Sequence, residues 1–120
     1  MILFGITMSA FLSAVAMVES DNGLTSDNVY QLEEVYIRDV ERISGLRFSV
    51  DAKYNRAASE TIMCIYLSHY GKVYERKTGN KATYEVLARI HNGGPDGWKK
   101  KSTERYWEKV KSHLYRMEAK

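Results

Sequence analysis

Residues 88–98 read Ala-Arg-Ile-His-Asn-Gly-Gly-Pro-Asp-Gly-Trp, a helix end followed by a turn with few side chains. Apolar residues recur at helical spacing up to Ile90. Asn92 and Gly93 are typical of a helix end because they enter the left-handed region at low cost. The glycines that follow leave the main chain bare, so a ligand or a neighbouring segment can approach it closely. The stretch predicts a helix–turn–helix corner with His91 at its edge.

The composition is that of an ordinary globular domain. The chain has 120 residues and a net charge of +3, with 44% hydrophobic and 28% charged residues. This mild positive charge suits an anionic polymer such as a bacterial cell wall, and it is well short of that of a nucleic-acid arm. We therefore predict one domain over residues 1–120, acting as a monomer without cofactor or nucleic acid.

The single cysteine, Cys64, lies in the apolar run Ile-Met-Cys-Ile over residues 62–65. One thiol allows no intramolecular disulfide, so the chain is not a disulfide-stapled secreted scaffold. The apolar context predicts a small buried hydrophobe rather than a nucleophile.

Residues 2–18 are apolar and almost uncharged, and three interpretations are open. The run is marginal for a transmembrane helix, which needs about 20 apolar residues. A signal peptide needs a basic start, which is absent, although Ala-Val-Ala at 14–16 resembles a cleavage site. We favour a core helix from about Ser9, because cleavage would leave Glu19 on a frayed terminus. Residues 1–8 are then an N-terminal extension or a membrane-directing segment, and membrane contact is expected only if the apolar run is an anchor or signal.

Apolar residues at three- and four-residue spacing predict four further helices, and no useful stretch alternates as a strand would. The second helix covers about residues 29–44, capped by Ser26 or Asp27 and ended by Gly45. The remaining helices are expected at about 52–70 with Asp51 as cap, at about 82–91, and after Ser102 or Thr103. The predicted class is all-α, or α with a minimal β element, with about five helices around one core.

Two segments at opposite ends of the chain resemble the invertebrate-type (destabilase) lysozyme family. Residues 87–95, Leu-Ala-Arg-Ile-His-Asn-Gly-Gly-Pro, followed by Thr103 and Tyr106-Trp107-x-x-Val110, look like its C-terminal motif. Residues 16–20, Ala-Met-Val-Glu-Ser, resemble the end of its catalytic helix. Shorter similarities join them: Tyr30-Gln31-Leu32, Tyr36-x-x-Asp39 and Tyr66-Leu67-x-x-Tyr70-Gly71.

The resemblance implies a lysozyme-like helical domain that hydrolyses the β-1,4 bond between N-acetylmuramic acid and N-acetylglucosamine in peptidoglycan glycan strands. It implies a secreted, cell-envelope or phage-associated protein. Animal members depend on many disulfides, so the single cysteine here suggests a cysteine-poor bacterial or phage-like homologue. It also implies Glu19 as the general acid, which fits the end of an apolar helix because desolvation favours a protonated carboxyl. Without the resemblance, Glu19 is the first polar residue after a buried helix.

The second carboxylate is open, because the family's loop between the acid and its partner is cut short here. Counting back from the Tyr-Gln pair places Asp21 at the partner's position, only two residues from Glu19. Retaining glycosidases hold the two carboxyls about 5–5.5 Å apart, which this spacing reaches only with a particular bend. Asp27 is the alternative, whereas Glu33 and Glu34 are expected on a solvated helix surface. A single-acid mechanism assisted by the substrate's acetamide would need neither aspartate.

The remaining candidate site residues are His91, the aromatic Trp98 and the polar residues near Glu19 and the 88–98 corner. His91 is either a donor in the cleft or a helix-end histidine that bonds a free carbonyl. Trp98 is expected to cover the core. The three histidines lie far apart in sequence with no matching acids, which predicts no metal site. The substrate-binding residues are predicted to be Tyr30, Gln31, His91, Asn92 and Gly93.

Other functions also fit the sequence. The shortened loop is compatible with a catalytically impaired lysozyme-fold module that binds glycans or has a structural role. A lytic transglycosylase would use the same acid and release anhydro-sugars. A basic helical nucleic-acid binder fits less well, because aromatic residues do not interleave the lysines.

Overall fold

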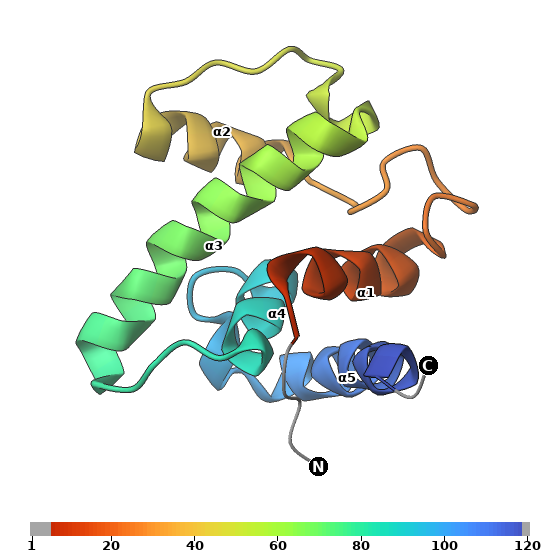
Figure 1. Cartoon of the computed structure of the whole chain (residues 1–120). Coiled ribbons are helices and arrows are strands. Elements are labelled where there is room, and N and C mark those ends of the chain that lie inside the picture. The colour runs from red at the N-terminus through yellow and green to blue at the C-terminus, as the bar shows by residue number, and fades with distance from the viewer. Residues whose placement is uncertain (1–5, 119–120) are drawn as a thin grey trace.

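The computed structural model of the chain describes residues 6–118, and within them it is helical with no strand (Figure 1). This confirms the predicted all-α class with five helices. The helices are α1 (Met8–Ser20), α2 (Glu34–Ser44), α3 (Arg56–Thr78), α4 (Tyr84–Gly93) and α5 (Glu104–Glu118). Short 3-10 turns cover Ala52–Tyr54, Gly97–Lys99 and Lys101–Thr103.

The helices pack around one core. α1 lies beside α5, α5 packs on α4, α4 on α3, and α3 on α2, so that the long α3 joins the two ends of the domain (Figure 1). Each helix contributes fully buried side chains to this core: Phe11 and Val15, Val40, Ile62 and Met63, Ile90, and Val110 and Leu114.

The apolar N-terminal run forms the core helix α1. Thr7 caps it by accepting a hydrogen bond from the Ala10 amide at 3.1 Å. Buried side chains face several directions around the helix because α1 is surrounded by its neighbours. No helix within residues 6–118 has both the length and the apolar character of a membrane span. Residues 1–5 of the predicted extension lie outside the described residues, whereas the Ile6 carbonyl accepts a hydrogen bond from Tyr84.

The second helix begins at Glu34, so the predicted start near residue 29 was wrong. The Asn28 side chain accepts from the Leu32 amide at 2.9 Å and donates to the Leu32 carbonyl at 3.0 Å. Gln31 adopts a left-handed φ of 54° inside this turn. A local side-chain bond to the backbone therefore overrides the apolar spacing on which the prediction rested.

The third helix begins later and ends later than predicted. Residues 52–54 form a separate 3-10 turn, and Asn55 caps α3 instead of Asp51. The polar stretch from Lys72 to Thr78, beyond the predicted helix end near residue 70, is helical. Its last turns lie under the following corner, where the Tyr74 ring contacts Trp98 edge-on at 5.0 Å between centroids. That tertiary contact is not visible in the local sequence.

Cys64 is exposed, which corrects the prediction of a buried hydrophobe. α3 turns Ile62, Met63, Tyr66 and Leu67 inward, and Cys64, between these pairs, faces solvent. Partial desolvation of the sulfur, and then the charge of Glu60, raise the pKa of the thiol. A raised pKa disfavours the nucleophilic thiolate.

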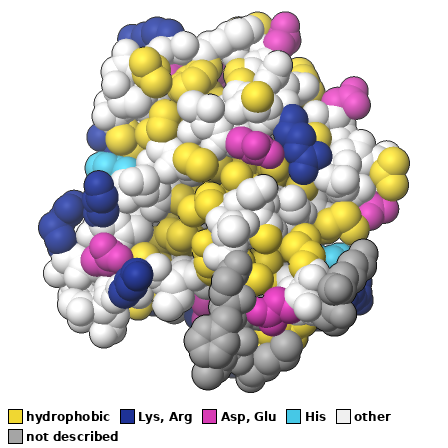
Figure 2. All heavy atoms as spheres, in the orientation of Figure 1, with side chains coloured by type: hydrophobic (Ala, Val, Ile, Leu, Met, Phe, Trp, Pro, Cys, Tyr) yellow, Lys and Arg dark blue, Asp and Glu magenta, His cyan; other side chains and the backbone are white. Residues whose placement is uncertain are grey.

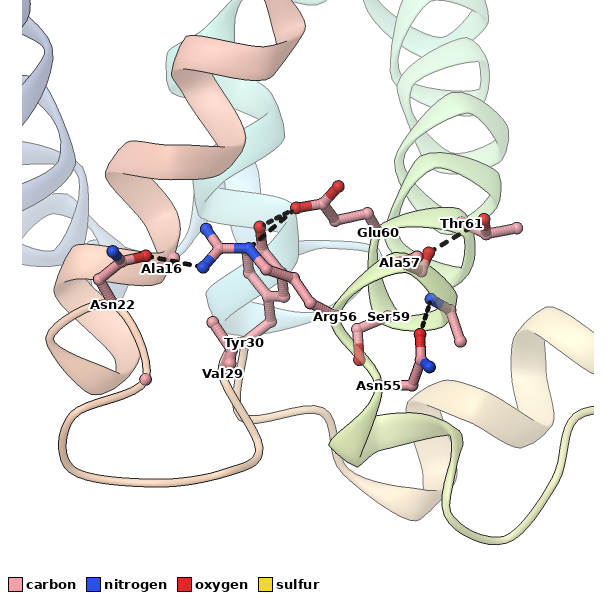
Figure 3. Close-up of polar contacts among 12 residues, drawn as sticks. Ala16, Asn22, Val29, Tyr30, Asn55, Arg56, Ala57, Ser59, Glu60 and Thr61 are labelled. Carbon is pink, nitrogen blue, oxygen red and sulfur yellow. Dashed lines mark hydrogen bonds and ion pairs between the residues drawn. The ribbon is translucent and has the colours of Figure 1, made fainter.

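The loop after α1 is tied to α3 by a polar clamp (Figure 3). Arg56 donates to the Asn22 side chain at 2.8 Å and to Glu60 at 3.3 Å. The Tyr30 hydroxyl donates to the same Glu60 oxygen at 2.5 Å. At the start of the loop, Ser20 donates to the Val29 carbonyl at 2.6 Å. These bonds fix the loop without any disulfide.

Two of the three glycines of the 88–98 corner are explained by close approach of the chain to itself, and the third, Gly94, by its left-handed φ of 88°. A Cβ on Gly97 would lie 2.0 Å from the Arg89 carbonyl oxygen, and one on Gly93 would lie 2.5 Å from Thr103. Thr103 then locks the corner by donating to the Gly97 carbonyl at 2.7 Å and accepting from Arg89 at 2.8 Å. Trp98 packs against the core as expected.

We predict that Gly97→Ala destabilises the fold by about 3 kcal/mol, because the clashing atom belongs to backbone that cannot rotate away. Chemical denaturation measures the loss of unfolding free energy. Gly45→Ala is the matched control: its Cβ meets nothing within 4 Å, and its φ of 75° costs only about 1 kcal/mol. Equal losses for the two variants would contradict the assigned close approach.

Candidate active site

An open cleft of about 760 Å³ lies between α2 and the C-terminal end of α4. The last turn of α1 supplies Glu19 to it, and α3 supplies Tyr66. The other lining residues come from the segment before α2, from α2, and from the α4 corner: Gln31, Glu33, Val35, Tyr36, Arg38, Asp39, Arg42, His91, Asn92, Gly93, Gly94 and Pro95.

Glu19 is held by two groups on one of its oxygens. The Tyr106 hydroxyl donates to Oε2 at 2.8 Å, and His91 Nε2 lies 3.4 Å from the same atom. The side chain is 17% exposed, so the carboxyl is largely desolvated and still reaches the cleft. Oε1 has no partner among the described residues, which leaves that oxygen available to a bound molecule.

His91 is almost fully enclosed, with a side-chain exposure of 3%. Its Nδ1 lies 3.0 Å from the Tyr36 hydroxyl, so the ring links Tyr36 to Glu19. Tyr36 is fixed in turn by Tyr66, whose ring stacks on it at 3.7 Å and 14°. The position of His91 thus fits a donor in the cleft.

Burial keeps the phenols around Glu19 neutral. Desolvation raises the pKa of Tyr36 well above its usual value, and the neighbouring Tyr66 adds to the shift. Desolvation, followed by the Glu19 charge, raises the pKa of Tyr106 in the same direction. Both hydroxyls therefore keep their protons and remain hydrogen-bond donors.

Four of the five predicted binding residues line the cleft with Glu19: Gln31, His91, Asn92 and Gly93. Tyr30 does not, because it is fully buried and its hydroxyl belongs to the loop clamp.

The predicted aspartates lie away from the cleft lining. Asp21 is the left-handed C-cap of α1, with a φ of 52°. It lies near His113. Burial and the charge of Arg116 lower the pKa of His113, and the Asp21 charge offsets only part of this shift. Asp27 is exposed on the loop. Neither aspartate is among the residues that line the cleft around Glu19.

The structure adds Asp39 and Glu33 to the carboxylates of the cleft. Asp39 accepts hydrogen bonds from Tyr70 and from Arg42, the latter at 2.6 Å. Burial alone would raise the pKa of Asp39, but these donors outweigh burial and hold it below its usual value. The three-residue spacing of Tyr36 and Asp39 on one helix face is the signal that could have revealed this wall. Within residues 6–118, no three His, Cys, Asp or Glu side chains are grouped to hold a metal.

We predict that stability falls steeply above about pH 10. Unfolded phenols lose their protons there while Tyr36 and Tyr106 keep theirs, so the native state binds more protons and rising pH favours unfolding. Tyr36→Phe and Tyr106→Phe should each flatten the pH dependence of the unfolding free energy by about 1.4 kcal/mol per pH unit. Denaturant titrations from pH 9 to 11 measure this slope. Tyr54→Phe, which removes an exposed phenol, should not change it.

Comparisons with known proteins identify the family of the chain. No family model matches the chain. A lysozyme of Magallana gigas is 40% identical over 81 residues, which are 68% of this chain and 55% of the relative. A lysozyme of Meretrix lusoria is 32% identical over 115 residues, covering 88% of this chain and 89% of the relative. Invertebrate-type lysozyme 6 of Caenorhabditis elegans is 34% identical over 97 residues, covering 76% and 69%. The chain belongs to the invertebrate-type lysozyme family of glycoside hydrolases.

Proposed function

We propose that the chain is a muramidase that hydrolyses the β-1,4 bond between N-acetylmuramic acid and N-acetylglucosamine in peptidoglycan, with Glu19 as general acid. The observation that carries the proposal is the setting of Glu19. It is a largely buried carboxyl in an open cleft, held on Oε2 by Tyr106 and His91 with Oε1 unengaged.

In the proposed reaction, Oε1 of Glu19 donates a proton to the bridging oxygen as the bond from the anomeric carbon to that oxygen breaks. The Tyr106 hydroxyl, 2.8 Å from Oε2, stabilises the carboxylate that proton transfer leaves. Water then adds to the anomeric carbon, and the same carboxylate accepts its proton. Gln31, Asn92 and Gly93 provide polar groups along the cleft for the sugar hydroxyls and acetamides.

Asp21 is the proposed second carboxylate by its place in the sequence, two residues after Glu19. Its position at the helix cap beside His113 supports instead the alternative in which the substrate's own acetamide attacks the anomeric carbon. In that alternative neither Asp21 nor Asp27 is required.

We predict that Glu19→Gln lowers the release of soluble muropeptides from peptidoglycan by 10²–10⁴-fold, the usual contribution of a general acid. Glu33→Gln is the matched control, because it removes a carboxylate from the same cleft without touching the acid. Liquid chromatography of the muropeptides measures the rate and identifies the products.

Reducing ends indicate hydrolysis, and anhydro-sugars indicate a lytic transglycosylase. Glycan binding without turnover by the wild type would identify an impaired binding module, and equal rates for wild type and Glu19→Gln would remove Glu19 from the mechanism. On the face drawn in Figure 2, acidic side chains lie beside basic ones, and the basic side chains do not form a stripe. This face therefore gives no support to a nucleic-acid role.

Asp21→Asn separates the two mechanisms. We predict a loss of more than about 100-fold in turnover if Asp21 is the second carboxylate. A change of less than threefold would mean that the substrate's acetamide takes that role. Asp27→Asn, on the exposed part of the same loop, controls for loop charge.

We further infer a monomer of bacterial or phage-like origin that acts on the cell envelope. The support is the single cysteine, together with a loop held by the Arg56 clamp where crosslinks would otherwise be needed.

A further inference from the structure

We propose that Tyr36 and His91 form a positioning pair that fixes the imidazole proton on Nε2 and directs this N–H at Glu19. The pair is defined by the contact of the Tyr36 hydroxyl with His91 Nδ1 at 3.0 Å. The placement of the proton stands on geometry alone, and only its catalytic consequence rests on the proposed muramidase activity.

The Tyr36 hydroxyl is the starting point. It is buried, and His91 Nδ1 is its only hydrogen-bond partner among the described residues. A buried hydroxyl proton needs an acceptor, because leaving one unpaired costs about 1–3 kcal/mol. If Tyr36 accepted from a protonated Nδ1, its own proton would have no acceptor in residues 6–118. Tyr36 therefore donates, and Nδ1 carries the lone pair.

This choice determines the other ring nitrogen. A neutral imidazole with an unprotonated Nδ1 carries its proton on Nε2. Nε2 lies 3.4 Å from Oε2 of Glu19, so a proton on Nε2 lies beside a carboxylate oxygen and attracts it. The opposite tautomer would direct a lone pair at that oxygen. The Tyr36–His91 bond thus sets the sign of the interaction at Glu19.

The surrounding helices hold the pair rigid. The Tyr36 ring from α2 is stacked on Tyr66 from α3 and meets the His91 ring edge-on at 5.4 Å and 74°. His91 lies in the last turn of α4 and is 3% exposed, so water does not replace either partner. A locked tyrosine holds the imidazole in one tautomer and one orientation.

The consequence concerns where the acid carries its proton. The Tyr106 hydroxyl donates to Oε2 of Glu19, and a proton on His91 Nε2 adds positive charge 3.4 Å from the same oxygen, so a proton on the carboxyl is favoured on the unengaged Oε1. The same two groups stabilise the carboxylate after proton transfer. Because the Tyr36 hydroxyl and His91 Nδ1 are engaged with each other, loss of the Tyr36 hydroxyl should act on turnover and not on substrate binding.

The first test is ¹⁵N NMR of the histidine rings, recorded as a pH series so that the spectra of the neutral rings are identified. His69→Gln and His113→Gln variants assign the remaining signals to His91. We expect an unprotonated Nδ1 and a protonated Nε2 in the wild type, and a mixture of tautomers in Tyr36→Phe. A protonated Nδ1 in the wild type, or an unchanged pattern in Tyr36→Phe, overturns the proposal. This readout does not depend on activity, so it stands even if the chain proves not to be a muramidase.

The second test is kinetic. Tyr36→Phe should lower kcat about tenfold with KM changed less than twofold. Tyr84→Phe is the control for loss of a tyrosine hydroxyl bond elsewhere, since its hydroxyl bonds the Ile6 carbonyl outside the cleft. His91→Gln keeps an N–H for Glu19 without needing a tautomer, so adding Tyr36→Phe to it should cause no further loss. Full additivity of the two substitutions, or a loss confined to KM, would show that Tyr36 has only a structural role.

Discussion

The bond from Tyr106 to Glu19, with His91 beside it, is the contact on which the arrangement of the domain depends. A carboxyl that is 17% exposed needs donors within the protein, because a desolvated charge without partners is costly. Each helix supplies one member of the cluster: Glu19 from α1, Tyr36 from α2, Tyr66 from α3, His91 from α4 and Tyr106 from α5. The helices must therefore be fully assembled before Glu19 reaches this environment.

The loop after α1 shows how a nearly cysteine-free chain holds this region. The Glu60 carboxylate on α3 accepts hydrogen bonds from Tyr30 and Arg56, and Arg56 also donates to the Asn22 side chain on the loop. Hydrogen bonds to charged groups contribute about 1.5–3 kcal/mol each when buried, and less where water screens them. The clamp fixes the direction of the loop, while the apolar core carries most of the stability. It also explains why Tyr30, part of a segment similar to the family, is buried rather than exposed to sugar.

The differences between expectation and structure have one common source. Apolar spacing finds the helices and most of the core, but a side chain that bonds the backbone, as Asn28 does, can delay the start of a helix. A polar run such as 72–78 can stay helical because a distant residue packs on it, here Trp98 on Tyr74. The outward face of Cys64 depends on which helices surround α3, and the residues of α3 alone do not specify this.

The sequence by itself determined the helical class, the family and the corner motif, and it singled out Glu19 as the candidate acid. Helix period, helix-end residues and the string around His91 are local properties that survive without coordinates. Only the tertiary structure decided which side chains share the cleft. It brought Asp39 into the same cleft lining as His91 and Glu19 and placed Asp21 at a helix cap outside that lining. It also brought the Tyr36 hydroxyl into contact with His91. The physical reason is that each of these contacts joins residues on different helices, and only the packing of those helices specifies which side chains meet.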